Sequence, residues 1–156
     1  MDRLADLIAR YAQPGRFDWI GIRPVRRGEM QALDRVEITE AGLKGDRGRA
    51  GKRAVTLVQA EHMAVIGGFL GQGTVPPEAL RRNLVISGIN IAGLRRRQVA
   101  LGGALLEITG PCAPCSRMEE HFGPGGYAAV RGHGGMTARV LQPGAVALGD
   151  VLRPID

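Results

Sequence analysis

Apolar and polar residues follow two different periods along this 156-residue chain. Near the start, apolar side chains recur at the helical spacing i, i+3, i+4 and i+7, and Pro14 with Gly15 ends the pattern. These side chains are Leu4, Leu7, Ile8 and Tyr11, and they predict an amphipathic helix over residues 2–12. Most later apolar runs are short and are bounded by glycine, proline or charged residues, which is typical of strands. The predicted strands cover residues 19–25, 36–39, 53–58, 84–87, 98–101, 104–109 and 137–141, with turns and strand alternating from Pro143 to Leu152.

Three further segments predict short helices between these strands, over residues 59–70, 76–82 and 116–122. Short strands at regular turn spacing, interrupted by a few helices, predict a mainly β (α+β) fold whose sheet curls on itself or closes into a barrel. The chain length suits one domain. Because Pro14 separates the first helix from the first predicted strand, we expect residues 1–16 to form an appendage and residues 17–156 to form the domain.

Composition supports a turn-rich chain and leaves several ligand classes open. Glycine accounts for 24 of 156 residues, about twice the average usage, and follows no repeat. Lys+Arg number 21 against 15 Asp+Glu, a net charge of +6, and all but two of the basic residues are arginine. Arginine binds phosphate with two hydrogen bonds, so a phosphorylated cofactor or nucleic acid would suit this charge. Aromatic residues are only 4%, which does not favour nucleic acid, because no stacking platform is visible.

Targeting signals do not change this picture. The chain shows no secretory n-region and h-region at its start and no apolar run approaching 18 residues. We therefore expect no membrane span and a cytoplasmic location.

The two cysteines of the chain carry its most specific chemical signal. Cys112 and Cys115 lie three residues apart, bracketed by prolines, between the strand at 104–109 and the helix at 116–122. Ser116 and Glu119 fit a capping box, which would place Cys115 one residue before the helix N-cap. Backbone N–H groups and the nearby Arg117 favour a thiolate there, so we predict that Cys115 is reactive or binds a metal.

The pattern leaves three roles open for Cys112: a disulfide with Cys115, ligation beside it, or packing alone. A thioredoxin-type role needs a βαβ context, which the predicted elements do not show around the pair. A zinc site needs further ligands, and no histidine stands at zinc spacing from the two cysteines.

Two other polar segments are candidate binding elements. The short helix at 76–82 delivers two arginines, Arg81 and Arg82, and Asn83 into a strand. Arginine can hold a phosphate there and asparagine can bind the edge of a heterocycle; a solvated helix end is the alternative. The glycine-rich loop at 42–51 contains Asp46 and leads to Arg53. Its chemistry resembles a phosphate nest without Walker A spacing, and a flexible basic loop is an equally good interpretation.

Taken in order, these segments resemble the MOSC domain, the module named for the C-terminal part of molybdenum cofactor sulfurases. The segments that carry the resemblance are Gly42–Asp46, Arg53–Leu57, Arg81–Val85 with Ser87-Gly-Ile, Gly110–Cys115, and Gly134–Val140 through Gly144 to Gly149-Asp150. The resemblance covers residues 17–153, and small stand-alone bacterial members of the family look much like this chain.

The resemblance implies a fold of strongly twisted, mostly antiparallel strands that close into a MOSC-type β-barrel with peripheral helices. It implies that Cys115 ligates the molybdenum of a pterin cofactor, which makes this residue both the metal ligand and the catalytic residue. Arg81 and Asn83 would help to hold the pterin or its phosphate, and Asp46 and Arg53 would line the same pocket.

Two positions depart from the family pattern. Some relatives have a histidine after the Gly-Asp pair, where this chain has Arg47, so a role for that histidine is unsupported here. Cys112 is an additional thiol that could align with the ligand of some relatives, which makes it the alternative to Cys115 as a cofactor-binding residue.

Three functions fit the resemblance. The first is an oxidoreductase that reduces N-hydroxylated small molecules, with electrons from an external electron-transfer protein. The second is a sulfur carrier in which Cys115 receives a persulfide from a cysteine desulfurase. The third is a non-catalytic module that binds the molybdenum cofactor. The sequence leaves open which of these applies, whether the protein is an enzyme, and whether purified protein retains the cofactor.

Overall fold

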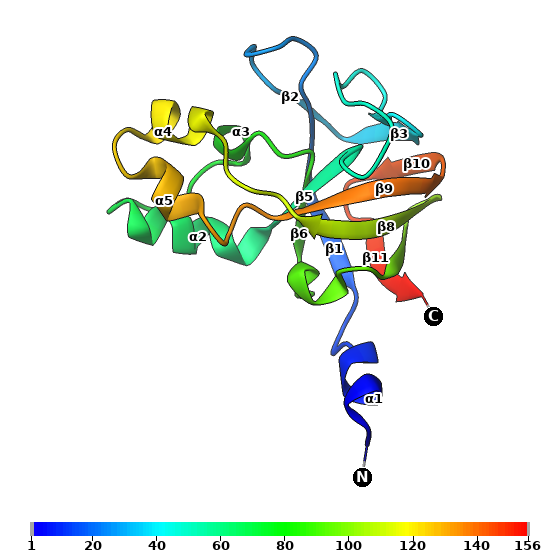
Figure 1. Cartoon of the computed structure of the whole chain (residues 1–156). Helices are drawn as coiled ribbons and strands as arrows, with labels where there is room; N and C mark the ends of the chain where they lie inside the picture. Colours follow the sequence, from blue (N-terminus) through cyan, green and yellow to red (C-terminus); the bar gives the residue numbers. More distant parts are fainter. Residues whose placement is uncertain (1, 156) are drawn as a thin grey trace.

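The computed structural model describes residues 2–155 of the chain (Figure 1). Its strands are β1 (Gly15–Ile22), β2 (Gln31–Leu33), β3 (Arg35–Thr39), β4 (Gly42–Leu43), β5 (Val55–Gln59), β6 (Leu84–Ser87), β7 (Gln98–Leu101), β8 (Ala104–Pro111), β9 (Met136–Gln142), β10 (Gly144–Ala147) and β11 (Val151–Ile155). Its helices are α1 (Leu4–Ala9), α2 (Ala60–Phe69), α3 (Pro77–Leu80), the 3₁₀ helix η1 (Ile91–Leu94), α4 (Ser116–Phe122) and α5 (Gly126–Val130).

Seven strands close into a barrel, as expected. Their order is β11-β7-β8-β9-β5-β6-β1, and β11 pairs with β1 to complete the ring, while β2 extends the sheet beyond β1. Neighbouring strands are antiparallel except β5 and β6, which run parallel because α2 and α3 connect them across the outside. The barrel is therefore mixed rather than wholly antiparallel.

The barrel interior is the main hydrophobic core. Its largest fully buried side chains include Phe17, Ile20, Leu57, Leu84, Ile86, Leu101, Leu106 and Ile108. Burying each such side chain stabilises the fold by roughly 1.5–3 kcal/mol before the loss of chain entropy is counted. A second sheet, β10-β3-β4, adds Val36, Ile38, Leu43 and Val146 to the same core.

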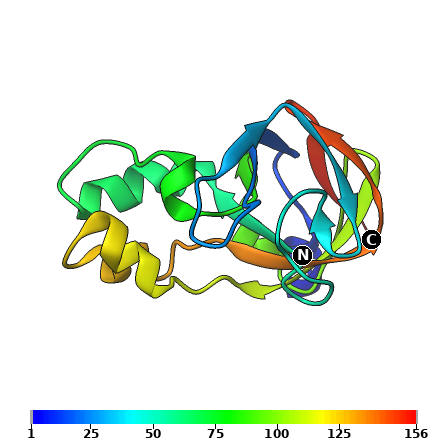
Figure 2. The same ribbon diagram turned by 90° about the horizontal axis from the view of Figure 1, so that it is seen from above.

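Helices α2 to α5 gather beside the barrel (Figures 1 and 2). A second apolar cluster fills the space between these helices and the strands β5 and β6, with Val58 and Val85 meeting Met63, Ile66 and Met118. This arrangement explains why every residue of β5 is buried, since both faces of the strand are covered. The helix layer also brings α3 and α4 to the barrel edge where the cysteine segment leaves β8.

Several elements differ from the sequence expectation. The strand expected at 19–25 begins earlier, at Gly15, and ends at Ile22, two residues before Pro24. The first helix is shorter than predicted, Leu4–Ala9, and none of its residues is buried. The short elements β2, β4, η1 and α5 were not predicted, and β4 lies at the start of the segment expected to be a loop at 42–51. Within residues 2–155, no helix combines the length and apolar character that a membrane crossing requires.

Candidate functional site around Cys115

The cysteine segment leaves β8 at Pro111 and reaches α4 without a turn or bend. Cys115 is exposed, whereas Cys112 is only 4% exposed. Three residues of such extended chain span roughly 10 Å between α carbons, beyond the roughly 7 Å that a disulfide can bridge. Both thiols are free, and this geometry does not suit the disulfide alternative.

The start of α4 differs from the predicted capping box. Cys115 itself is the N-cap residue, so Ser116 is the first helical residue. The Glu119 carboxylate instead accepts hydrogen bonds from the backbone N–H groups of Gly125 (3.1 Å) and Tyr127 (3.0 Å) at the start of α5. Cys115 therefore lies closer to the first N–H groups of α4 than the sequence suggested.

Arg82 anchors the cysteine segment from inside the protein. It is only 6% exposed, and its Nε donates to the carbonyl of Gly134 (2.7 Å) while a terminal nitrogen donates to that of Ala113 (3.0 Å). The backbone N–H of Cys112 donates to the Gly135 carbonyl (2.8 Å), so the cysteine segment is also bonded to the segment that leads into β9. Burial lowers the pKa of Arg82, while the nearby thiol groups of Cys112 and Cys115 oppose this shift.

The Arg81 side chain lies within electrostatic range of Cys115. Its backbone is left-handed, with φ of 57°, as it ends α3. One terminal nitrogen donates to the carbonyl of Gly28 (2.7 Å) in the β1–β2 loop. Burial and the charges of other arginines, led by Arg117, lower the pKa of Arg81, and Cys115 opposes this shift. The thiol thus lies within electrostatic range of a group of guanidinium side chains.

A basic cavity of about 420 Å³ lies next to these residues. It is formed by the β1–β2 loop, α3 and α4, and its basic side chains are Arg27, Arg81, Arg117 and His121. Glu29 and Glu78 are its acidic side chains. Arg117, two residues after Cys115 in the chain, lines the cavity, so the cavity lies against the first turn of α4.

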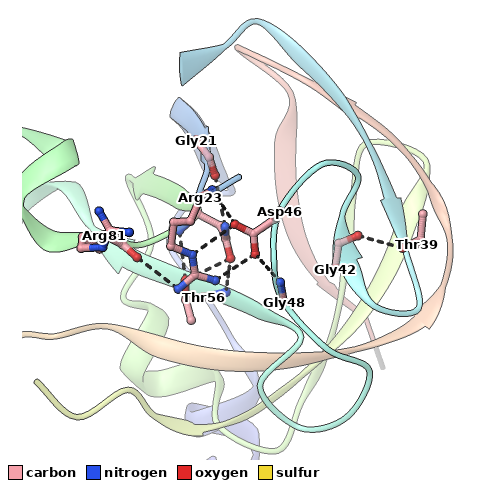
Figure 3. A network of polar contacts seen from close by, with 9 residues as sticks. Gly21, Arg23, Thr39, Gly42, Asp46, Gly48, Thr56 and Arg81 are labelled. Atoms are coloured by element: carbon pink, nitrogen blue, oxygen red, sulfur yellow. Dashed lines mark hydrogen bonds and ion pairs between the residues drawn. The ribbon is translucent and has the colours of Figure 1, made fainter. Parts of the chain in front are cut away.

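Asp46 is held in a buried ion pair with Arg23 (Figure 3). Its carboxylate accepts from the Arg23 backbone N–H (2.6 Å), from Nε (3.1 Å) and from a terminal nitrogen (2.9 Å), and also from the Gly48 N–H (3.0 Å). Burial raises the pKa of Asp46, but the hydrogen bonds and charge of Arg23 outweigh it and hold the pKa below its ordinary value. Arg23 also donates to the carbonyl of Arg81 (3.4 Å), which links the 42–51 loop to the candidate site.

Asn83 lies in the barrel wall, with no exposed surface. Its amide nitrogen donates to the Gly21 carbonyl (3.1 Å), and its amide oxygen accepts from the backbone N–H and the hydroxyl of Thr56 (both 3.1 Å). These bonds join β1 and β5 at the start of β6, and a hydrogen bond from Asn83 also helps to lower the pKa of Asp46, so any effect of Asn83 on a ligand would be indirect. Arg53 is exposed and close enough to Arg82 to affect its pKa.

The comparison with family models agrees with this fold. Residues 39–153 match the model of the MOSC domain. The chain belongs to the MOSC domain family. No curated protein matches it.

Solved structures share the MOSC fold at low sequence identity. The YuaD protein of Bacillus subtilis aligns with a TM-score of 0.78 and 19% identity, covering 92% of this chain and 97% of its own. YiiM from Geobacillus stearothermophilus gives 0.75 and 19%, covering 92% and 76%. YiiM from Escherichia coli gives 0.71 and 23%, covering 90% and 70%.

The donor groups of the site suit a metal that arrives with its own ligands. Within residues 2–155, no three His, Cys, Asp or Glu side chains gather closely enough to hold a metal ion by themselves. Cys115 offers a single soft sulfur ligand, and the adjacent cavity offers guanidinium groups for a phosphate. A metal chelated by a phosphorylated cofactor fits this combination of groups.

Sequence reasoning missed Arg23 as a member of this site, and it assigned no separate role to Arg82 and only a nearby charge to Arg117. Arg82 was visible as the second residue of the Arg-Arg-Asn stretch, but the pattern gave no reason to separate it from Arg81. Arg23 has no local signal, because its partner Asp46 lies 23 residues away.

Proposed function

We propose that this MOSC protein binds molybdenum cofactor through the Cys115 thiolate. The observation that carries the proposal is a free, exposed thiol at the start of α4, close to the guanidinium groups of Arg81, Arg82 and Arg117. A soft thiolate suits molybdenum that is already bound by sulfur atoms of a pterin dithiolene.

The basic cavity supports the binding of the phosphate group of the cofactor. Arg81 and Arg117 would hold the phosphate of the cofactor, because guanidinium groups bind phosphate oxygens in pairs. Arg82 would act as a positioning residue, since its bonds to Gly134 and Ala113 fix the segment that carries the ligand. Asp46 would act in the same way, because it fixes Arg23, which holds the carbonyl of Arg81.

The reaction we propose is the reduction of an N-hydroxylated compound. One N–O bond breaks, two electrons and two protons are taken up, and an amine and water form. The bound cofactor supplies this two-electron redox chemistry. The protein holds the cofactor, orients it and shapes its surroundings, and a separate electron-transfer protein provides the electrons. Two free cysteines suit a reducing compartment, and we place this reaction in the cytoplasm.

The test is the molybdenum and pterin content of protein purified from a molybdenum-replete host. Wild-type protein and the matched control Cys112→Ser should contain molybdenum and pterin in proportion to protein. Cys115→Ser should contain at least about tenfold less molybdenum than wild type, because the loss of a metal ligand weakens binding by well over about 1.4 kcal/mol. Equal metal in Cys115→Ser and wild type would refute Cys115 as the ligand. Activity is then measured by reduction of benzamidoxime with a chemical electron donor.

A sulfur carrier is the second candidate, and the exposure of Cys115 favours it as well. A persulfide acceptor must be reached by a cysteine desulfurase, and an accessible thiol beside positive charge meets that need. A labile adduct with the mass of one sulfur atom on Cys115, in protein without molybdenum, would support the carrier. Bound molybdenum cofactor with no reduction of benzamidoxime would support a non-catalytic binding module.

A further inference from the structure

A second cavity, of about 370 Å³, lies beside the cysteine segment and shares no lining residue with the basic cavity. Residues 112–114 form part of its wall, and α2, α5, η1, the loop at 131–135 and the ends of β5, β8 and β9 contribute the rest. Its volume falls within the range of small-molecule sites, which is roughly 300–1,000 Å³. The proposed binding of a cofactor at Cys115 makes no use of this space.

The walls of this second cavity are mainly apolar. The apolar lining side chains are Ile91, Ala92, Pro111, Ala113, Pro114 and Met136, and Tyr127 also contributes. A methionine thioether and proline rings pack well against the face or edge of a planar aromatic molecule. The lining therefore favours a ligand with a flat apolar body.

The cavity is held open by close backbone contacts. A Cβ at Gly134 would overlap the Cys112 carbonyl, and a Cβ at Gly135 would overlap the Leu57 carbonyl. The loop at 131–135 thus lies directly against the cysteine segment and β5, and Arg82 adds its bond to the Gly134 carbonyl. Because its walls are tied together, the cavity is formed before any ligand binds.

One positive charge lines this cavity, and within the part of the chain that the structure describes no carboxylate lines it. The charge belongs to Arg131, which is exposed and has no side-chain hydrogen bond or ion pair among residues 2–155. Two side chains with titratable rings line the wall, the imidazole of His62 and the phenol of Tyr127. Burial and the neighbouring His133 lower the pKa of His62, and Glu61 opposes this, so the imidazole is neutral at pH 7.

Neutral His62 adds a hydrogen-bonding group in a fixed orientation. Its ring meets that of His133 edge to face, with 4.8 Å between the centroids. Gln59 has less capacity to hydrogen-bond a ligand, because its side-chain amide is already bonded to backbone groups of Ile86, Ile89 and Ile91.

From these features we propose that the second cavity binds a small aromatic carboxylate. The aromatic ring would lie among Ile91, Pro114 and Met136, and the carboxylate would accept hydrogen bonds from the Arg131 guanidinium, with His62 as a further polar contact. The geometry requires no cofactor, so this proposal stands or falls separately from the function proposed for Cys115.

The test uses 1-naphthoate as the probe and the methionine methyl groups as reporters. In protein labelled with [methyl-13C]methionine, titration with 1-naphthoate should shift the Met136 signal in a saturable way, while Met30 in the basic cavity should not shift. The neutral analogue 1-naphthamide should bind about tenfold more weakly, because a hydrogen bond to a charged group is worth roughly 1.5–3 kcal/mol.

Two substitutions test separately the contribution of the Arg131 charge and that of the cavity volume. Arg131→Gln should weaken 1-naphthoate about tenfold and leave 1-naphthamide unchanged, whereas the matched surface variant Arg153→Gln should bind both like wild type. Ala92→Trp should abolish binding by filling the cavity, with Ala5→Trp on the exposed helix α1 as its control. A shift of Met30 alone, no shift at all, or equal effects of Arg131→Gln and Arg153→Gln would overturn the proposal.

Discussion

Two neighbouring arginines in this protein have opposite surroundings. Arg82 is buried and bonded to two carbonyl groups, while Arg81 points to the basic cavity. The left-handed backbone of Arg81, with φ of 57°, turns the chain out of α3 so that Arg82 and Asn83 enter the barrel wall. A non-glycine residue in this conformation costs roughly 1–3 kcal/mol, and such strain is common at binding sites.

The buried pair of Asp46 and Arg23 should contribute measurably to stability. Asp46→Asn removes one partner and leaves a charge with little solvent contact, so we expect a loss of about 3 kcal/mol in the free energy of unfolding. Glu107→Gln breaks the more exposed pair with Arg139 and should cost less than about 1 kcal/mol. Urea denaturation at pH 7 measures both, and equal losses would contradict this account of Asp46.

The same pair predicts a pH dependence. The folded protein holds the pKa of Asp46 below the ordinary value of 3.8. Its contribution is therefore complete above that pH and is lost as the pH falls through the lowered pKa of the folded state. The stability difference between wild type and Asp46→Asn should be constant from pH 7 to about pH 5 and should shrink below the ordinary pKa.

Local sequence signals predicted single residues only where their surroundings are local. Cys115 was placed correctly before a helix, because prolines and the start of α4 are its neighbours in the chain. The burial of Asn83 and Arg82 depends on Gly21, Thr56 and Gly134, which come from distant elements. No pattern within a short window contains that information.

The site depends on two neighbouring segments, residues 112–115 and 131–135, which extend the antiparallel pairing of β8 with β9. Neither belongs to a helix or strand throughout, and they are joined by the Cys112–Gly135 hydrogen bond and by Arg82. Residues 131–135 approach the backbone of the cysteine segment and of β5 so closely that glycine is required at positions 134 and 135. Gly135 has φ of 92° and lies against the Leu57 carbonyl, whereas Gly132 has φ of 85° and open space around it.

Gly132 and Gly135 make a matched test of how closely residues 131–135 pack against β5. Gly132→Ala should cost roughly 1–2 kcal/mol, because it only forces alanine into a left-handed backbone. Gly135→Ala should cost roughly 2–5 kcal/mol, because the methyl group also displaces β5. Thermal unfolding followed by circular dichroism would measure the stability of both variants. Equal destabilisation would show that residues 131–135 pack less tightly against β5 than we describe.

Periodicity predicted the longer elements and missed the short ones. The helix expected at 116–122 and the strand expected at 84–87 occur with those bounds. The segments β2, η1 and α5 have three to five residues each, too few to show a period. Their positions are set by contacts: the start of α5, for example, is fixed by the Glu119 carboxylate.

At the scale of the whole molecule, the barrel begins at β1 and the first helix lies outside it (Figure 1). Short helices are marginal in isolation, and α1 buries none of its residues. Short strands and turns predicted a curled sheet or a barrel, and the family resemblance implied that the sheet closes. The parallel pair β5–β6 was not predicted, although the predicted order of strand, two helices and strand from residue 53 to residue 87 is the connection that parallel strands need.

Removal of residues 2–12 should therefore leave the domain intact. We expect a change in the free energy of unfolding within about 0.5 kcal/mol, since the segment loses only exposed contacts such as the bond from Arg97 to the Ala9 carbonyl. Denaturation of the truncated protein beside the full chain is the measurement. A loss above roughly 2 kcal/mol would place this helix within the cooperative unit.

X-ray absorption at the molybdenum edge tests the role of Cys115 most directly. In cofactor-loaded protein, the metal should have one more sulfur neighbour in wild type and in Cys112→Ser than in any cofactor that Cys115→Ser retains. A sulfur shell unchanged by Cys115→Ser, or reduced by Cys112→Ser instead, would contradict the assignment of Cys115 as the ligand.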